Sequence, residues 1–311
     1  MKYRRLGQTG IKVSVIGIGT WQYGGEWGKT FTDSEVSGIL GRGLELGFNL
    51  IDTAECYGDH LSEELVGKAT KVNRHEWVIA TKFGHKFDGL FKRQQIWDTQ
   101  GVLKQLDESL AALQTDYIDL YQFHSGSDAL FNNDELWEAL RQQVKAGKIR
   151  HLGVSIGSNE NVYQTNAAPQ VGAETIQVVY NRLDRNPEAD VFPACIRNNL
   201  GVLARVPLAS GFLSGKYKPG AIFGSEDVRS NRDREELDAR LRLVADIQKT
   251  EVPEGQDMAQ WAMAWCLQHA AVSACIPGFK NIAQLESGAR AADLDLVSDA
   301  HPQAWKQVGK G

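Results

Sequence analysis

Four side chains in the first half of the sequence are of the types needed to move a proton to or from an oxygen atom. They are a carboxylate, a phenol, an ammonium and an imidazole, from Asp52, Tyr57, Lys82 and His124. A phenol is a weak acid at neutral pH, with a reference pKa of about 10. A neighbouring ammonium lowers that pKa, and a carboxylate can hold the ammonium in place. The four residues predict a general acid–base group beside an imidazole, suited to an oxygen that becomes alkoxide-like when a carbonyl accepts hydride.

These side chains are far apart in the sequence, so the elements around them must bring them together. Short apolar segments predict eight strands, at residues 15–19, 48–53, 77–82, 117–124, 149–155, 175–181, 201–207 and 272–277. The segments are rich in Val, Ile and Leu without clean alternation, as expected of parallel strands covered on both faces. Between them, apolar residues recur at spacings of three and four, which predicts amphipathic helices.

Eight strand–helix pairs can close into a (β/α)8 TIM barrel or lie open as a doubly wound sheet. Polar residues stand at or near the C-terminal ends of six different predicted strands, at Asp52, Lys82, His124, Ser155, Gln177 and Arg205. A barrel gathers these ends into one ring, where its active site is built, whereas an open sheet spreads them along an edge. We therefore predict an α/β fold, a (β/α)8 TIM barrel, as a single domain over residues 1–311.

Three segments do not fit the strand–helix alternation. Residues 1–14 predict a hairpin that turns at 7–10 and plugs the barrel floor. The stretch 208–256 is too long for one connection, and we expect a long functional loop at 209–233 and an extra helix at 235–250 after strand 7. Residues 297–308 predict a further helix.

Composition excludes several classes of protein. The 34 Lys and Arg residues against 39 Asp and Glu residues give a net charge of −5, which disfavours a nucleic-acid partner. No apolar run approaches the ~18 residues of a membrane span, and no secretory signal is evident. The four cysteines form no CxxC pair, which favours a cytoplasmic location without disulfides, and the histidines show no metal-ligand spacing. We expect no metal, and Cys56 is expected to be a buried thiol; the oligomeric state is left open.

Seven segments, in chain order, resemble signature elements of the aldo-keto reductase family. They are IDTAECYG at 51–58, ATKFG at 80–84, DLYQFH at 119–124, GVS at 153–155, IQVVYN at 176–181, PLASGFLSGKY at 207–217 and IPGFK at 276–280. The resemblance covers nearly the whole chain. It implies a barrel enzyme that reduces aldehydes or ketones with a nicotinamide cofactor, usually NADPH, and without a metal.

The resemblance also implies roles for individual residues. Tyr57 would be the proton donor, Lys82 and Asp52 would lower its pKa, and His124 would orient the carbonyl. Substrate contacts would come from Trp21, Tyr57, His124 and Ser125. Cofactor contacts would come from Thr20, Trp21, Ser155, Gln177, Arg205, Pro207, Leu208, Ser210, Gly211, Lys216, Gly278, Lys280 and Gln284.

The sequence departs from the family pattern at several positions. Ile156 replaces an Asn of the GVSN element, and Arg205 stands where many relatives carry an aromatic residue against the nicotinamide. Near the adenosine end, Gln284 and Gly288 stand where Arg and Asn are common, so NADPH is expected with NADH as the alternative. Ser125 replaces a frequent aromatic residue, which favours a roomier, more polar pocket and a sugar- or polyol-derived substrate.

Two other functions remain open from the sequence. Lys82 could form a Schiff base, as in barrel lyases, although a lysine paired with Asp52 is held charged and an amine nucleophile must be neutral. A cofactor-binding regulatory subunit is the second alternative, because potassium-channel beta subunits resemble this family. For an enzyme, the loop 209–233 is expected to fold over the bound cofactor as a lid, with Lys216 near the pyrophosphate.

Overall fold

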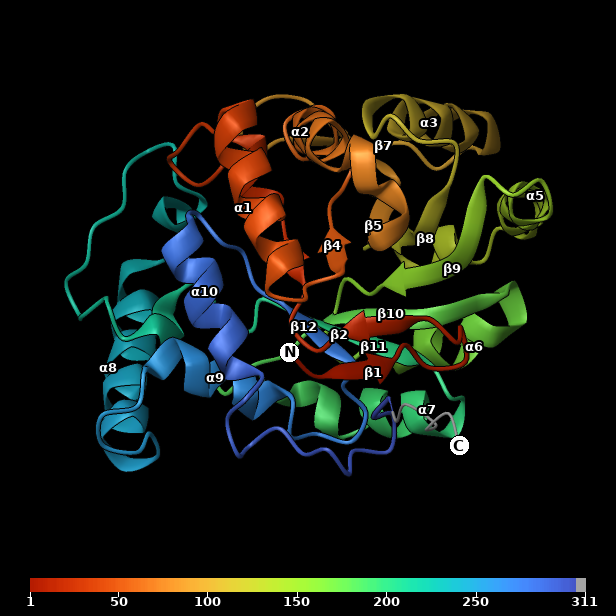
Figure 1. Cartoon of the computed structure of the whole chain (residues 1–311). Coiled ribbons are helices and arrows are strands. Elements are labelled where there is room, and N and C mark those ends of the chain that lie inside the picture. The colour runs from red at the N-terminus through yellow and green to blue at the C-terminus, as the bar shows by residue number, and fades with distance from the viewer. Residues whose placement is uncertain (306–311) are drawn as a thin grey trace.

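The structure, a computed structural model, describes residues 1–305 and has a barrel of parallel strands at its centre (Figure 1). The hydrogen-bonded order is β12-β11-β10-β9-β8-β5-β4-β3. The strands are β3 (Ile18–Gly19), β4 (Leu50–Asp52), β5 (Val78–Phe83), β8 (Ile118–His124), β9 (Ile149–Ser155), β10 (Ala173–Val179), β11 (Gly201–Arg205) and β12 (Ala274–Ile276). The first and last strands meet, because Gly19 N donates to Pro277 O at 2.8 Å and Cys275 N donates to Val15 O at 2.9 Å. The predicted (β/α)8 barrel is confirmed.

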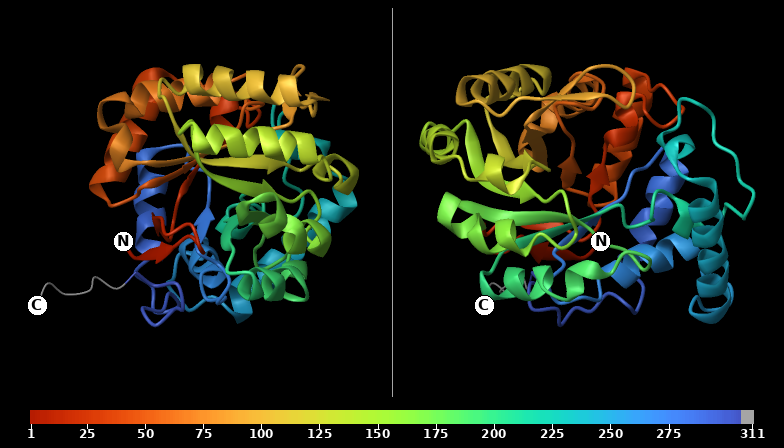
Figure 2. Two further views of the ribbon diagram at one scale, coloured as in Figure 1. Left: turned by 90° about the vertical axis from the view of Figure 1, so that its right-hand side faces the viewer. Right: turned by 180° about the vertical axis from the view of Figure 1, so that it is seen from behind.

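Helices surround the barrel and cover the outer faces of the strands (Figure 2). They are α1 (Asp33–Glu45), α2 (Leu61–Thr70), α3 (Thr99–Ala112), α5 (Asp134–Lys145), α6 (Val162–Val171), α7 (Val191–Arg197), α9 (Met258–Cys266) and α10 (Ile282–Ala291). Capping residues determine where the helices begin. At the start of α1, for example, Thr32 and Glu35 form a reciprocal capping box. On α3, Leu106 and Leu110 are buried, as their spacing predicts. No helix in residues 1–305 is both long enough and apolar enough to cross a membrane.

The N-terminal hairpin closes the floor of the barrel, as predicted. Its strands, β1 (Tyr3–Arg5) and β2 (Lys12–Ser14), pair antiparallel. Leu6 and Val13 are fully buried and pack with the inward-facing apolar residues of the strands. At the turn, Gly7 lies so close to the start of β11 that a Cβ would fall 2.1 Å from Gly201 N, so only glycine fits there.

The long segment after β11 contains the predicted loop and extra helix. The helix is α8 (Arg234–Thr250), which lies at the left of Figure 1, outside the ring. The loop holds two short 3-10 helices, η4 (Phe212–Ser214) and η5 (Val228–Asn231). It then reaches another loop of the barrel: Asp227 forms a β-bridge with Trp27, and Val228 N donates to Glu26 O at 3.0 Å.

Two other segments differ from the prediction. The helix predicted for 297–308 is absent over 297–305, where turns precede Pro302, a residue that disfavours helix at the position before it; residues 306–308 lie outside the described residues. A second hairpin, of β6 (His85–Phe87) and β7 (Arg93–Gln95), was not predicted. Asp88-Gly89 at its turn is a dipeptide typical of hairpins, but the strands are short and mostly polar.

Candidate active site

The C-terminal ends of three neighbouring strands bring Asp52, Lys82 and His124 together, and Tyr57 follows β4 on a tight turn. The Nζ atom of Lys82 lies 2.8 Å from Asp52 Oδ2 and 3.5 Å from the Tyr57 hydroxyl. It also donates to Thr53 O at 2.6 Å. Lys82 is fully buried, so one ammonium is held between a carboxylate and a phenol in the low dielectric of the barrel.

Close backbone packing fixes the position of Tyr57. A Cβ at Gly24 would fall 2.5 Å from the carbonyl carbon of Tyr57, so the 3-10 helix η1 (Trp21–Gly24) can touch this turn only through glycine. The Trp21 ring stacks on the phenol, with centroids 6.1 Å apart and planes at 23°. The His124 ring approaches edge-on at 6.3 Å. The rings of Trp21 and His124 thus flank the Tyr57 ring.

Burial, and not the neighbouring ammonium, dominates the acidity of the phenol. Burial raises the pKa of Tyr57 to about 12, and the Lys82 ammonium opposes that rise only in part. Lys82 acts in the expected direction and lowers the pKa of Tyr57, but burial outweighs it, and Asp52 raises that pKa instead of lowering it. For Lys82 itself, burial lowers the pKa, but Asp52 and Tyr57 outweigh burial and the net pKa is raised. The lysine is consequently held charged at neutral pH.

The second carboxylate oxygen of Asp52 is held by two amides. Gln177 Nε2 donates to Oδ1 at 2.7 Å and Gln122 Nε2 donates to it at 3.2 Å. Gln122 was not identified from the sequence, although it stands two residues before His124 and so faces the same side of its strand. The amide nitrogen of Gln177 is thus engaged, which leaves its oxygen to accept from a carboxamide.

His124 faces a carboxylate that was not identified from the sequence. Its Nδ1 lies 3.5 Å from Glu55 Oε1 and 3.9 Å from Cys56 Sγ. Burial lowers the pKa of His124 to about 4, with Glu55 acting in the opposite direction, so the imidazole is neutral at neutral pH. Burial raises the pKa of Glu55, but His124 and the His85 N–H outweigh it and the net pKa is lowered. Cys56 is buried, as expected.

Two buried polar atoms at the ends of β9 and β11 have no hydrogen-bond partner within residues 1–305. They are Ser155 Oγ, at the end of β9, and Arg205 Nε, at the end of β11. The Nη2 atom of Arg205 donates to Ile156 O at 3.2 Å, while the Ile156 side chain is fully buried. Buried polar groups are nearly always hydrogen-bonded, so both atoms are free to bond to a polar group that enters the site.

The other predicted cofactor residues lie in three places. Pro207, Leu208, Ser210 and Gly211 form the turn after β11, where Arg232 Nη2 donates to Ser210 Oγ at 3.3 Å, and Lys216 is exposed further along the loop. Thr20 is fully buried and donates to Asp52 O at 3.0 Å, so its hydroxyl belongs to the framework under the site. Ser125 is half-buried beside His124, with its N–H bonded to Ser155 O at 2.8 Å.

Near α10, the predicted adenosine contacts have specific partners. Lys280 Nζ donates to Trp27 O at 2.8 Å, and Lys280 N donates to Gln284 Oε1 at 2.9 Å. Gly278 bridges to Gly19 where the barrel closes. A Cβ at Gly288 would fall 2.5 Å from the Phe279 ring, so a larger residue at this position would require that ring to move.

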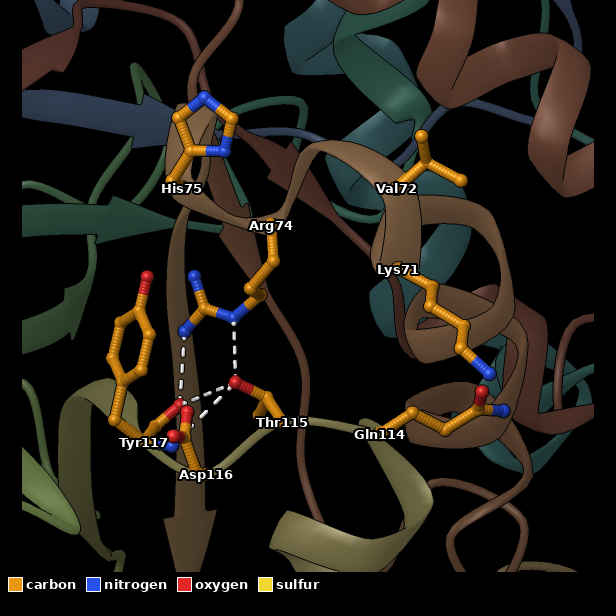
Figure 3. A pocket seen from close by; sticks show the side chains of 8 residues that line it. All are labelled: Lys71, Val72, Arg74, His75, Gln114, Thr115, Asp116 and Tyr117. Carbon is orange, nitrogen blue, oxygen red and sulfur yellow. Dashed lines mark hydrogen bonds between the residues drawn. The ribbon is translucent and has the colours of Figure 1, made fainter.

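A separate surface pocket lies at the other end of the strands (Figure 3). Its lining residues precede β5 and β8: Lys71, Val72, Arg74, His75, Gln114, Thr115, Asp116 and Tyr117. Arg74 is already bonded to Thr115 Oγ1 at 3.2 Å and to Tyr117 O at 3.0 Å. This pocket therefore lies on the floor side, away from Lys82 and His124.

Comparison with known proteins decides the family. Residues 15–309 match the family model described as the Aldo/keto reductase family. The chain belongs to this family. As an aldo/keto reductase, the protein is an oxidoreductase. Members of this family use nicotinamide cofactors to reduce carbonyl compounds.

Individual relatives agree with this assignment. The aldo/keto reductase is 34% identical to Aldo-keto reductase YhdN of Bacillus subtilis, covering 92% of this chain and 87% of the relative. It is 30% identical to a probable voltage-gated potassium channel subunit beta of Arabidopsis thaliana, covering 94% and 92%. Among solved structures, glycerol dehydrogenase AKR11B4 from Gluconobacter oxydans superimposes with a TM-score of 0.80, at 28% identity, covering 93% of this chain and 90% of that one.

Proposed function

We propose that this aldo/keto reductase interconverts a small polyhydroxylated aldehyde or ketone and its alcohol, with Tyr57 passing the proton. The observation that carries the proposal is the position of the Lys82 ammonium, 2.8 Å from Asp52 and 3.5 Å from the Tyr57 hydroxyl. When charge develops on the substrate oxygen, Tyr57 donates its proton, and Lys82 stabilises the phenolate that remains. In the reverse direction the phenolate takes the proton of the alcohol.

The residues at the mouth fit a nicotinamide cofactor, which supplies the hydride when it is bound. Ser155 Oγ and the free oxygen of Gln177 can hold a carboxamide, and the planar Arg205 guanidinium can stack on an aromatic ring. We propose NADPH over NADH because cations gather near α10. Lys29 Nζ lies 3.3 Å from Lys280 O, and burial, Arg229 and Lys29 together lower the pKa of Lys280. Such a cluster favours an additional phosphate.

The polyhydroxylated substrate is proposed from the polarity of the pocket. Ser125, His124 and Tyr57 supply hydroxyl and imidazole groups beside the flat Trp21 ring, which suits a substrate with several hydroxyls. The structurally similar glycerol dehydrogenase carries a polyol in its name. The experiment is a screen of cofactor oxidation and reduction over simple aldehydes, aldoses, glycerol and inositols, in both directions and with both cofactors. Turnover of simple apolar aldehydes alone would contradict the substrate class.

Two alternative functions, a regulatory subunit and a Schiff-base lyase, can be tested with the same purified protein. A regulatory subunit, as suggested by the potassium-channel relative, would bind the cofactor with high affinity and show no turnover in the screen. A Schiff-base lyase would be trapped covalently by borohydride with substrate. The three acceptors around Lys82 hold it charged, so we expect no trapped adduct, and mass spectrometry of the intact chain would detect one.

A further inference from the structure

Three metal-ligating atoms converge beside the phenol, and two of them, on Glu55 and Cys56, have no role in carbonyl reduction. Glu55, Cys56 and His124 each present one such atom, and these atoms all lie within 4.8 Å of one another. Nδ1 of His124 is 3.5 Å from Glu55 Oε1 and 3.9 Å from Cys56 Sγ. Zinc bonds of about 2.0–2.3 Å separate the ligands of a tetrahedral site by roughly 3.3–3.7 Å, so small side-chain movements would complete one.

Two buried atoms beside this cluster lack a partner. Glu55 is only 2% exposed, and its Oε2 has no hydrogen-bond partner within residues 1–305. The same is true of Nδ1 of His85, whose ring lies 5.0 Å from the ring of His124. An unsatisfied buried carboxylate oxygen is costly, and a cation at this point would satisfy it.

The cationic side chains near Glu55 form ion pairs with other carboxylates, so within residues 1–305 Glu55 has no lysine or arginine partner. Lys82 is paired with Asp52 at 2.8 Å, and Arg93 is paired with Glu26 at 2.5 Å. Among the described residues, the one ion-pair partner of Glu55 is the imidazole of His124. A carboxylate without a lysine or arginine partner offers negative charge to a divalent cation. Burial and Glu55 raise the pKa of the Cys56 thiol, so the metal itself must displace the thiol proton when the sulfur binds.

We propose that Glu55, Cys56 and His124 bind a thiophilic divalent cation such as Zn²⁺ and that the bound ion inhibits the enzyme. The mixed sulfur, nitrogen and oxygen set suits zinc and disfavours Mg²⁺ or Ca²⁺, which prefer oxygen ligands. On binding, the Cys56 thiol releases its proton to solvent and its sulfur bonds to the metal. Inhibition follows because His124 belongs both to this site and to the carbonyl site.

The test is a titration of the full chain with Cd²⁺ or Co²⁺, followed by the absorption band that arises from thiolate-to-metal charge transfer. We expect one equivalent to saturate the band, Zn²⁺ to displace the probe ion, and Mg²⁺ to have no effect. Cys56→Ala should abolish the band, whereas Cys195→Ala, which removes another buried thiol, should retain it. Glu55→Gln should weaken binding by about tenfold or more, as is common when a ligand is lost.

The experiment distinguishes failure of the metal-site proposal from failure of the proposed reaction. Thermal melts of each variant establish that it is folded, and the charge-transfer band does not depend on turnover. No band in the wild-type protein, or an unchanged band in Cys56→Ala, would overturn the site. Each variant's inhibition is measured against its own metal-free rate; Zn²⁺ should inhibit the wild type and Cys195→Ala but not Cys56→Ala. Stoichiometric binding without inhibition would overturn the inhibitory role.

Discussion

Arg205 donates from Nη2 to the main-chain oxygen of Ile156 across 3.2 Å, so two positions at which the sequence departs from its family pattern are in contact. Ile156 contributes a backbone acceptor and a fully buried side chain, and Arg205 contributes a planar cation. The two departures are therefore one arrangement, in which the main-chain carbonyl of Ile156 holds the guanidinium of Arg205.

Arg205→Ala should weaken NADP⁺ binding, because the stacked plane and its charge are both lost. Cation–π and stacking contacts of about 0.5–2 kcal/mol predict a rise in Kd of up to roughly 30-fold. Arg205→Lys keeps the charge without the plane and should recover only part of the affinity. Fluorescence titration with NADP⁺ measures both, and an unchanged Kd for the alanine variant would show that Arg205 does not contact the cofactor.

Tyr57→Phe should nearly abolish carbonyl reduction while it leaves cofactor affinity within a few-fold. The proton is needed only as charge develops on the substrate oxygen, so the loss should appear in kcat, by about 10²–10⁴-fold. Steady-state kinetics combined with a cofactor titration separate the two effects. Retained kcat would reject Tyr57 as the proton donor.

Lys82→Met should shift the pH dependence of alcohol oxidation upward. In this direction Tyr57 must act as a phenolate. Burial raises its pKa to about 12 and Lys82 opposes that rise, so removal of the ammonium raises the pKa further. The limb of the kcat profile that reports deprotonation should therefore move to higher pH. Lys68→Met, at a half-exposed lysine on α2, is the control and should leave the limb in place.

The same Lys82→Met change should also destabilise the fold, because it leaves the Asp52 carboxylate buried without its ion-pair partner. Breaking a buried pair typically costs about 3–5 kcal/mol. Urea unfolding should show this loss, and the double variant with Asp52→Asn should recover part of it. Activity of the single variant is accordingly measured at a temperature where it is folded.

The loop 209–233 should be protected from protease when NADP⁺ is bound. In the structure it reaches across to Trp27, where Asp227 is paired with Arg229 at 2.7 Å and Lys216 and Lys218 stay exposed. Trypsin should cut after Lys216 in the free protein and more slowly at saturating NADP⁺, whereas the Lys218–Pro219 bond is not a trypsin site. Equal cleavage rates at a cofactor concentration shown to bind would leave the lid without support.

The barrel could be predicted because the sequence patterns of its strands and helices are local and recur along the chain. Strand ends are marked by a change from apolar to polar residues, which placed Asp52, Lys82 and His124 on one rim. Gln122 was within reach of the same reasoning, because strand alternation points it to the side of His124. The hairpin at 85–95 gave only a weak signal, since its strands are three residues each and largely polar.

Other features depend on tertiary packing that a single sequence does not encode in any local pattern. Glu55 faces His124 because of the path of the turn after β4, and nothing in its immediate neighbours indicates that direction. The pKa of Tyr57 depends on how completely the barrel and Trp21 exclude water, and here that effect outweighs the charge of Lys82. The space at Gly288 is limited by the Phe279 ring, nine residues earlier in the chain.

The floor hairpin has a consequence for the order in which the chain can fold during synthesis. Arg4 is buried, and its guanidinium donates to Val272 O at 2.8 Å and to Leu267 O at 2.9 Å, partners 268 and 263 residues away. A ribosome makes residues 1–14 long before these acceptors exist. The hairpin cannot meet its final partners until residues 267–272 have been made, so closure of the barrel is a late folding event that depends on contacts of very high sequence separation.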